Sequence, residues 1–147
     1  MILMVHLLLG AVIVLKIKFL PLALPLAFLI HYPLDILPHW EYSIKNIKEK
    51  KWKNSFKDFL KVFVDISLGI LLIFIFSKNF SLLLIGGLVA ALPDAFTLLG
   101  LITPNKLLMA HENFHREIHF PEGKKISPIW GILTQLLVVI AAIYLLR

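Results

Sequence analysis

Long apolar runs separated by short polar stretches set the pattern of this chain. The runs cover residues 1–15, 19–37, 59–76, 80–102 and 129–146. A helix needs about 20 apolar residues to cross a bilayer, and only the first run is clearly short for a complete crossing. The pattern predicts an all-α fold, a polytopic membrane helical bundle of about five apolar segments. Residues 1–147 would form it as a single integral membrane domain.

Two amphipathic segments connect these runs. Residues 41–61 follow Trp40 and are rich in lysine: Lys45, Lys48, Lys50, Lys51, Lys53, Lys57 and Lys61. The aromatic residues Trp52, Phe56, Phe59 and Phe63 recur there at helical spacing, which predicts an interfacial amphipathic helix. A solvated charged linker is the alternative. Thr103 before Pro104 is typical of a helix N-cap, so we predict a second such helix from there to about His119.

Composition and charge favour a membrane location. The chain is 59% hydrophobic, above the usual share for a soluble domain, and its net charge is +6. The basic residues border apolar runs and no nucleic-acid motif is present, so we expect anionic lipid head groups, not nucleic acid, as partners. Cysteine is absent, which excludes disulfides, thiolate zinc sites and cysteine nucleophiles.

Lysine and arginine also predict an orientation. Five alternating segments place the 39–58 and 103–127 connections on one side, and these hold most of the basic residues. By the positive-inside rule that side is cytoplasmic, so both amphipathic helices lie there and the N-terminus is cytoplasmic. We expect a multi-pass protein of the cell (inner) membrane. All six histidines and the intramembrane aspartates then fall in the cytoplasmic half.

The first candidate site lies at the end of the second run. His31, Asp35 and His39 are four residues apart, so a helix would present them on one face. Pro33 and Pro38 disfavour helical geometry at the residues before them, which would leave His39 just past the helix end. The alternative is an ordinary helix end whose polar residues reach for water.

A second array follows some eighty residues later. His111, His115 and His119 repeat at the same spacing with no proline between them, so one helix face presents three imidazoles. A surface helix that merely carries histidines is the alternative reading. His6, near the start of the chain, is a further candidate ligand.

Intramembrane aspartates strengthen the case for a metal. Asp35, Asp65 and Asp94 lie in apolar runs that hold no lysine or arginine partner in their interiors. Each such carboxylate costs about 2.5–3.5 kcal/mol at the bilayer centre unless it is compensated. Histidine with carboxylate suits Zn²⁺, with Mn²⁺ or Fe²⁺ as alternatives, and such an ion acidifies a bound water. Asp65 and Asp94 are the candidate catalytic carboxylates, as general base or as orienting groups.

The motifs resemble those of a known family. His31-x-x-x-Asp35, Pro93-Asp94 and His115-Arg116-x-x-His119, together with His6, are similar to elements of YdjM-like membrane-bound metal-dependent hydrolases. Zinc-dependent phospholipase C-like proteins use similar motifs. The resemblance implies a small helical membrane protein that hydrolyses phosphoesters with a bound metal. The chain has Phe96 and Phe120 where that family usually has a second acid and a serine, and its motif order differs.

Three function classes follow from these observations. The leading one is a metal-dependent hydrolase of phosphoester or lipid-type substrates at the cytoplasmic membrane face. Its expected ligands are His31, Asp35, His39, Asp94, His115 and His119, with His6, Asp65 and His111 beside the metal or at a second one. A membrane metal or proton transporter is the second class, because acids and histidines in membrane helices also form relays. A non-catalytic membrane adaptor is the third.

Overall fold

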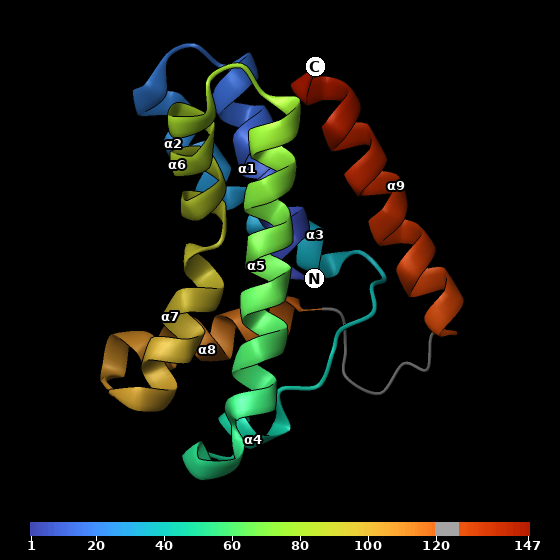
Figure 1. Cartoon of the computed structure of the whole chain (residues 1–147). Helices are drawn as coiled ribbons and strands as arrows, with labels where there is room; N and C mark the ends of the chain where they lie inside the picture. Colours follow the sequence, from blue (N-terminus) through green and yellow to red (C-terminus); the bar gives the residue numbers. More distant parts are fainter. Residues whose placement is uncertain (120–126) are drawn as a thin grey trace.

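The computed structural model describes residues 1–119 and 127–147, which form helices and connecting turns without any strand (Figure 1). The all-α class is therefore confirmed for these residues. The helices are α1 (Leu3–Lys16), α2 (Leu20–Leu29), α3 (His31–Ile36), α4 (Lys45–Lys48), α5 (Phe56–Phe76), α6 (Phe80–Ala90), α7 (Leu92–Ile102), α8 (Lys106–Ile118) and α9 (Pro128–Leu146), with a 3₁₀ turn at Trp52–Asn54.

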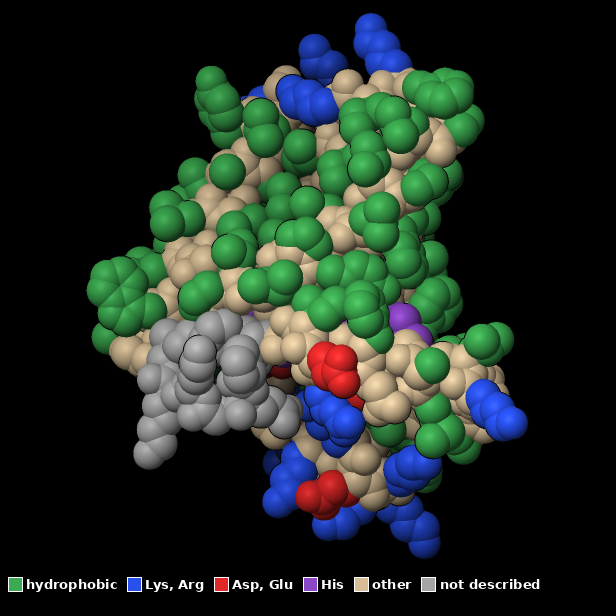
Figure 2. Space-filling model, turned by 180° about the vertical axis from the view of Figure 1, so that it is seen from behind, with side chains coloured by type: hydrophobic (Ala, Val, Ile, Leu, Met, Phe, Trp, Pro, Cys, Tyr) green, Lys and Arg blue, Asp and Glu red, His purple; other side chains and the backbone are tan. Residues whose placement is uncertain are grey.

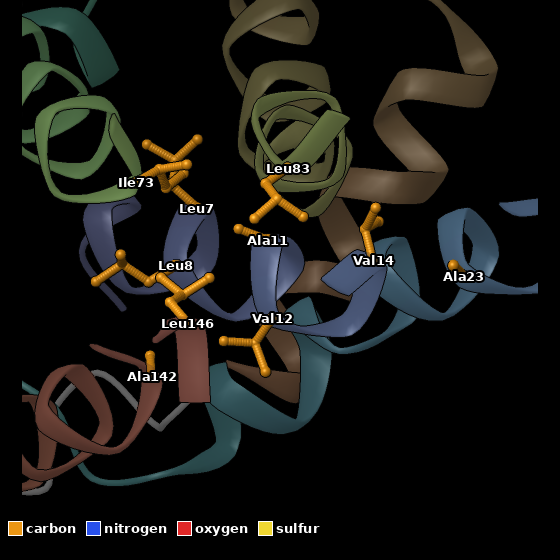
Figure 3. Packing of buried hydrophobic residues seen from close by; sticks show 10 residues of the cluster. All are labelled: Leu7, Leu8, Ala11, Val12, Val14, Ala23, Ile73, Leu83, Ala142 and Leu146. Carbon is orange, nitrogen blue, oxygen red and sulfur yellow. The ribbon is translucent and has the colours of Figure 1, made fainter. Parts of the chain in front are cut away.

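The short helix α1 forms the centre of the molecule. It packs against α2, α5, α6 and α9, so neighbours cover it on several sides. Figure 3 shows its side chains Leu7 and Leu8 among Ile73 of α5, Leu83 of α6 and Leu146 of α9, all of them buried. A helix that is apolar all round is expected in such a central position, and His6 is the only titratable side chain of α1 before Lys16.

Glycine allows α1 and α6 to approach closely. A Cβ atom on Gly10 would lie 2.3 Å from the carbonyl oxygen of Gly86 and 2.6 Å from Cβ of Ala90. One on Gly86 would lie 2.4 Å from Cγ2 of Val14. The sequence spacing of Gly86 and Ala90 is typical of such helix crossings in membranes.

The prediction of about five spanning segments is wrong for the described residues. Two helices are long and apolar enough to cross a membrane, α5 and α9, and a third crossing results if α6 and α7 count as one span bent by 53°. The apolar helices Leu3–Lys16 and Leu20–Ile36 are shorter. At about 1.5 Å per residue they fall short of the bilayer core, which is about 30 Å thick.

Two prolines break the apolar runs where the candidate site forms. A proline ring clashes with the carbonyl group four residues before it, which favours proline in the first turn of a helix, where Pro33 and Pro93 lie. Pro25 is an exception, because it lies inside α2. The chain accordingly breaks at Ile30, before α3, and at Ala91, before α7. The helix α3 ends at Ile36, so His39 lies beyond the helix end, as Pro38 predicts. Tyr32, in contrast, is helical although it precedes Pro33.

The predicted amphipathic helix over residues 41–61 is not formed as one element. Only α4, the 3₁₀ turn and the first turns of α5 are helical there. Lys50 interrupts the segment with a φ of 56°, and closely spaced lysines repel one another in a helix. Phe56, Phe59 and Phe63 nevertheless lie together on α5 with exposed side chains, so the aromatic stripe exists on a different helix.

The other amphipathic helix, α8, begins later than predicted. The side chain of Asn105 is its N-cap and accepts a 2.9 Å hydrogen bond from the backbone N–H of Leu108. The Thr103 hydroxyl instead donates to the carbonyl of Leu99 in α7, at 3.1 Å. The helix ends at Ile118, so His119 is its C-cap residue.

Apolar and charged side chains occupy different parts of the surface. Figure 2 shows apolar side chains over the middle of one face, with Lys and Arg at its two ends and more of them at the lower end. In Figure 1 the α1–α2 and α5–α6 turns lie at the same end as the C-terminus, and α4 lies at the opposite end. The segregation agrees with a membrane location, whereas the side on which each end lies remains a prediction.

Candidate metal centre

Four side chains from three helices meet at one point. His31 and Asp35 come from α3, Asp94 from the first turn of α7 and His115 from α8. One ligand atom of each lies within 4.8 Å of the others, and all but Asp94 are buried. We call these four residues the primary cluster. The two sequence arrays, expected to act together, therefore do lie side by side.

The separations within the primary cluster fit a tetrahedral ion. Nε2 of His31 lies 3.0 Å from Nε2 of His115 and 3.0 Å from Oδ2 of Asp35, and His115 Nε2 lies 2.9 Å from the same oxygen. Oδ1 of Asp94 lies 3.7 Å and 3.8 Å from the two imidazole nitrogens. Bonds of about 2.0–2.1 Å in a tetrahedron place ligand atoms about 3.3 Å apart. The observed distances lie on both sides of that value.

Backbone and hydroxyl groups orient the two histidines. Nδ1 of His31 lies 2.9 Å from the carbonyl oxygen of Ala90, the last residue of α6, where helix carbonyls lack an intrahelical donor. Nδ1 of His115 lies 3.4 Å from the hydroxyl of Thr97. With Nδ1–H donating outward, Nε2 presents its lone pair to the cluster, as in metal-bound histidines.

A secondary cluster adjoins the first and shares one residue with it. Asp35, His39 and His119 also bring ligand atoms within 4.8 Å of one another. Sequence reasoning missed Glu41, whose Oε1 lies 3.0 Å from Nε2 of His39 and 3.1 Å from Nε2 of His119. Its only signal was its position two residues after His39. The amino group of Met1 lies 2.9 Å from the same oxygen and also contacts Asp35.

Electrostatics in the secondary cluster favours the ionised form of the Glu41 carboxylate. Burial alone would raise the pKa of Glu41, but the imidazoles of His119 and His39 outweigh it and hold that pKa well below its usual range. Burial lowers the pKa of His119, and the Glu41 carboxylate more than offsets this, so the net shift is upward. The Glu41 carboxylate is thus ionised and faces two imidazoles.

His6 and His111 lie against the primary cluster but outside it. His6 is fully buried, stacks on His31 at 4.0 Å between ring centroids, and has Nε2 3.2 Å from Oδ1 of Asp35, without hydrogen-bond geometry. His111 stacks on His115 at 5.7 Å, and its Nε2 lies 3.4 Å from the hydroxyl of Tyr32. Both residues are better placed to support the ligand histidines His31 and His115 than to bind a metal ion themselves.

Asp65, predicted as a catalytic carboxylate, has other partners. It accepts hydrogen bonds from the backbone N–H groups of Leu3 at 2.8 Å and Met4 at 3.1 Å, and from the hydroxyl of Tyr42 at 2.9 Å. These bonds satisfy the first turn of α1. Asp94, in contrast, belongs to the primary cluster as a candidate ligand.

Comparison of the chain with protein-family models, with curated proteins and with solved structures finds no significant match. The resemblance to YdjM-like hydrolases therefore stays a prediction carried by the motifs. The described residues establish a buried His/Asp group that can hold a metal ion.

Proposed function

We propose that this protein is a membrane-bound, metal-dependent hydrolase of phosphoesters, lipid-type substrates included. The observation that carries the proposal is the convergence of His31, Asp35, Asp94 and His115 at tetrahedral separations. Two imidazoles and two carboxylates are a donor set that suits divalent zinc, manganese or iron. The motif resemblance to YdjM-like hydrolases points to the same chemistry.

The roles of the residues follow from their positions. A divalent ion held there would lower the pKa of a bound water toward neutrality. The Nδ1 contacts of His31 and His115 leave their Nε2 atoms free to face the cluster, where they would bind the ion. In the hydrolysis, the water oxygen bonds to phosphorus, the bond from phosphorus to the leaving oxygen breaks, and that oxygen takes up a proton.

The exposure of Asp94 suggests how the substrate enters. Its side chain is 30% exposed, whereas those of His31 and Asp35 are fully buried. We expect substrate to approach from the Asp94 side. The exposed apolar side chains of α5 and the lysines near α4 support a substrate that is itself a lipid or lies at a membrane surface.

Reconstituted protein tests this function. The full chain in vesicles, stripped with a chelator and reloaded with Zn²⁺ or Mn²⁺, should hydrolyse a model phosphodiester, and stripping should abolish the reaction. His115→Ala should reduce the rate by about 100-fold or more, because it removes a ligand and not merely a supporting group. Glu117→Gln, an exposed acid on the same helix, is the matched control.

Two outcomes would contradict the proposal. Hydrolysis that survives chelation, or that is unchanged in His115→Ala, would show that the reaction does not need the metal. Protein that hydrolyses nothing but carries the ion into the vesicles would favour the transporter class instead.

A further inference from the structure

We infer that the site holds two divalent cations, the second bound by His39, Glu41 and His119, with the carboxylate of Asp35 shared between the two. The inference rests on the proposed function and adds a second ion, with its own ligands, to the proposed site. It starts from the secondary cluster, which has no role if only the primary cluster binds an ion.

The donor atoms of the secondary cluster converge on one oxygen. Nε2 of His39 and Nε2 of His119 lie 3.0 Å and 3.1 Å from Oε1 of Glu41, and the two rings are 4.9 Å apart between centroids. These separations are close to those of the primary cluster and to the edge of a tetrahedron with bonds of about 2.0 Å. Two imidazoles and two carboxylates again form the donor set.

The orientation of His39 favours a cation beside it. Its Nδ1 lies 2.7 Å from the carbonyl oxygen of Leu37, so this nitrogen donates. In the neutral ring Nε2 then carries only a lone pair, and it faces a Glu41 oxygen that is also an acceptor. A metal cation bound by both atoms would turn this unfavourable approach of two acceptors into a favourable one. His31 repeats the arrangement with Ala90 and Asp35 in the primary cluster.

Asp35 connects the two clusters. Its Oδ2 lies 2.9 Å from Nε2 of His115 and 4.0 Å from Nε2 of His119, and it is fully buried. The amino group of Met1 contacts both Asp35 and Glu41, so one positive charge already lies between these carboxylates. A buried carboxylate with nitrogen donors from two clusters around it is placed to bridge a pair of ions.

A pair of ions agrees with the proposed phosphoester substrates. Two metals about 3.5–4 Å apart stabilise both the attacking and the leaving oxygen of an in-line displacement at phosphorus. The paired site therefore favours phosphate esters over carboxylic esters or amides. Asp94, His119 and Glu41, the partly exposed members of the two clusters, would flank the bound phosphate.

Metal stoichiometry tests the inference. The full chain, purified in detergent, stripped, reloaded with Mn²⁺ and freed of unbound ions, should hold close to two ions per chain by elemental analysis. Glu41→Gln and His39→Ala should each reduce this to about one, and Asp35→Asn to near none. Glu49→Gln, an exposed acid on the same connection that pairs with Lys51, is the matched control and should keep two. A second readout uses the wild type alone, whose electron paramagnetic resonance spectrum should show the spin-coupled signal of two neighbouring Mn²⁺ ions.

The results separate this inference from the proposed function. One ion per chain in the wild type, with no spin coupling and no loss in Glu41→Gln, would overturn the second site and leave a one-metal hydrolase standing. Two ions that persist in both Glu41→Gln and His39→Ala would place the second ion elsewhere and also overturn it. A wild type without bound metal would overturn both.

Discussion

Asp65 shows how a carboxylate inside an apolar helix is compensated without a metal. Three donors converge on it: two backbone N–H groups from the first turn of α1 and the hydroxyl of Tyr42. The first N–H groups of a helix have no partner within it, so a carboxylate placed there acts as a cap supplied by another helix. The hydrogen bonds offset the cost of burying this charge, and α1 is tied to α5.

Replacing Asp65 should therefore affect stability and not metal binding. Asp65→Asn keeps the shape but removes the charge and one acceptor oxygen, and we expect a loss of about 1 kcal/mol in the free energy of unfolding. Thermal unfolding in detergent should show a lower midpoint while elemental analysis shows unchanged metal. Loss of metal with an unchanged midpoint would contradict this and show that Asp65 takes part in metal binding.

The crossing of α1 and α6 is the tightest contact between elements and the one that centres α1. Gly10→Ala would place a methyl group 2.3 Å from the Gly86 carbonyl oxygen, and backbone cannot yield cheaply. We expect a loss of about 1–3 kcal/mol, the usual range for overpacking. Gly100→Ala is the matched control, because its new Cβ would lie 3.4 Å from Cβ of Leu108, an ordinary contact.

Thermal unfolding of the two variants in the same detergent provides the measurement. Gly10→Ala should unfold at a clearly lower temperature than Gly100→Ala. Equal midpoints would mean that the two helices can separate without cost, and that the buried position of α1 does not depend on this crossing.

Local spacing made part of the site predictable at the level of elements. Four-residue repeats placed His31 with Asp35, and His115 with its neighbours, on helix faces, and prolines indicated that His39 lies beyond a helix end. Apolar runs, however, do not reveal where a helix bends. The breaks at Ile30 and Ala91 each precede a helix that has a proline in its first turn, and they set where α3 and α7 begin.

Contacts between segments that are far apart in the sequence could not be predicted from it. Glu41 has no periodic partner, and only the folded chain brings it to His119, 78 residues later. Asp65 looked like a catalytic group because its compensating donors are backbone N–H groups of α1, which leave no mark in the sequence. Residue types predicted the chemistry better than they predicted which carboxylate takes part.

On the scale of the whole molecule, the candidate metal centre lies where the short helices end. The N-terminus contacts Asp35 of α3, and His31 of α3 contacts the last residue of α6 at the α6–α7 break. The helices α5 and α9 extend as the long apolar helices (Figure 1). Short helices packed against longer ones allow polar groups to gather inside the bundle while the outer surface stays apolar. The architecture suits a reaction carried out on a substrate held at a membrane.

X-ray absorption at the zinc K-edge of the full chain, loaded with zinc and freed of unbound ions by gel filtration, tests the central claim most directly, namely that α3, α7 and α8 together hold a metal. We predict a first shell of nitrogen and oxygen at about 2.0–2.2 Å, with outer-shell scattering from imidazole rings that weakens in His31→Ala. Because the chain has no cysteine, no thiolate contributes. Zinc that washes out completely, or a first shell of oxygen without imidazole scattering, would contradict the account.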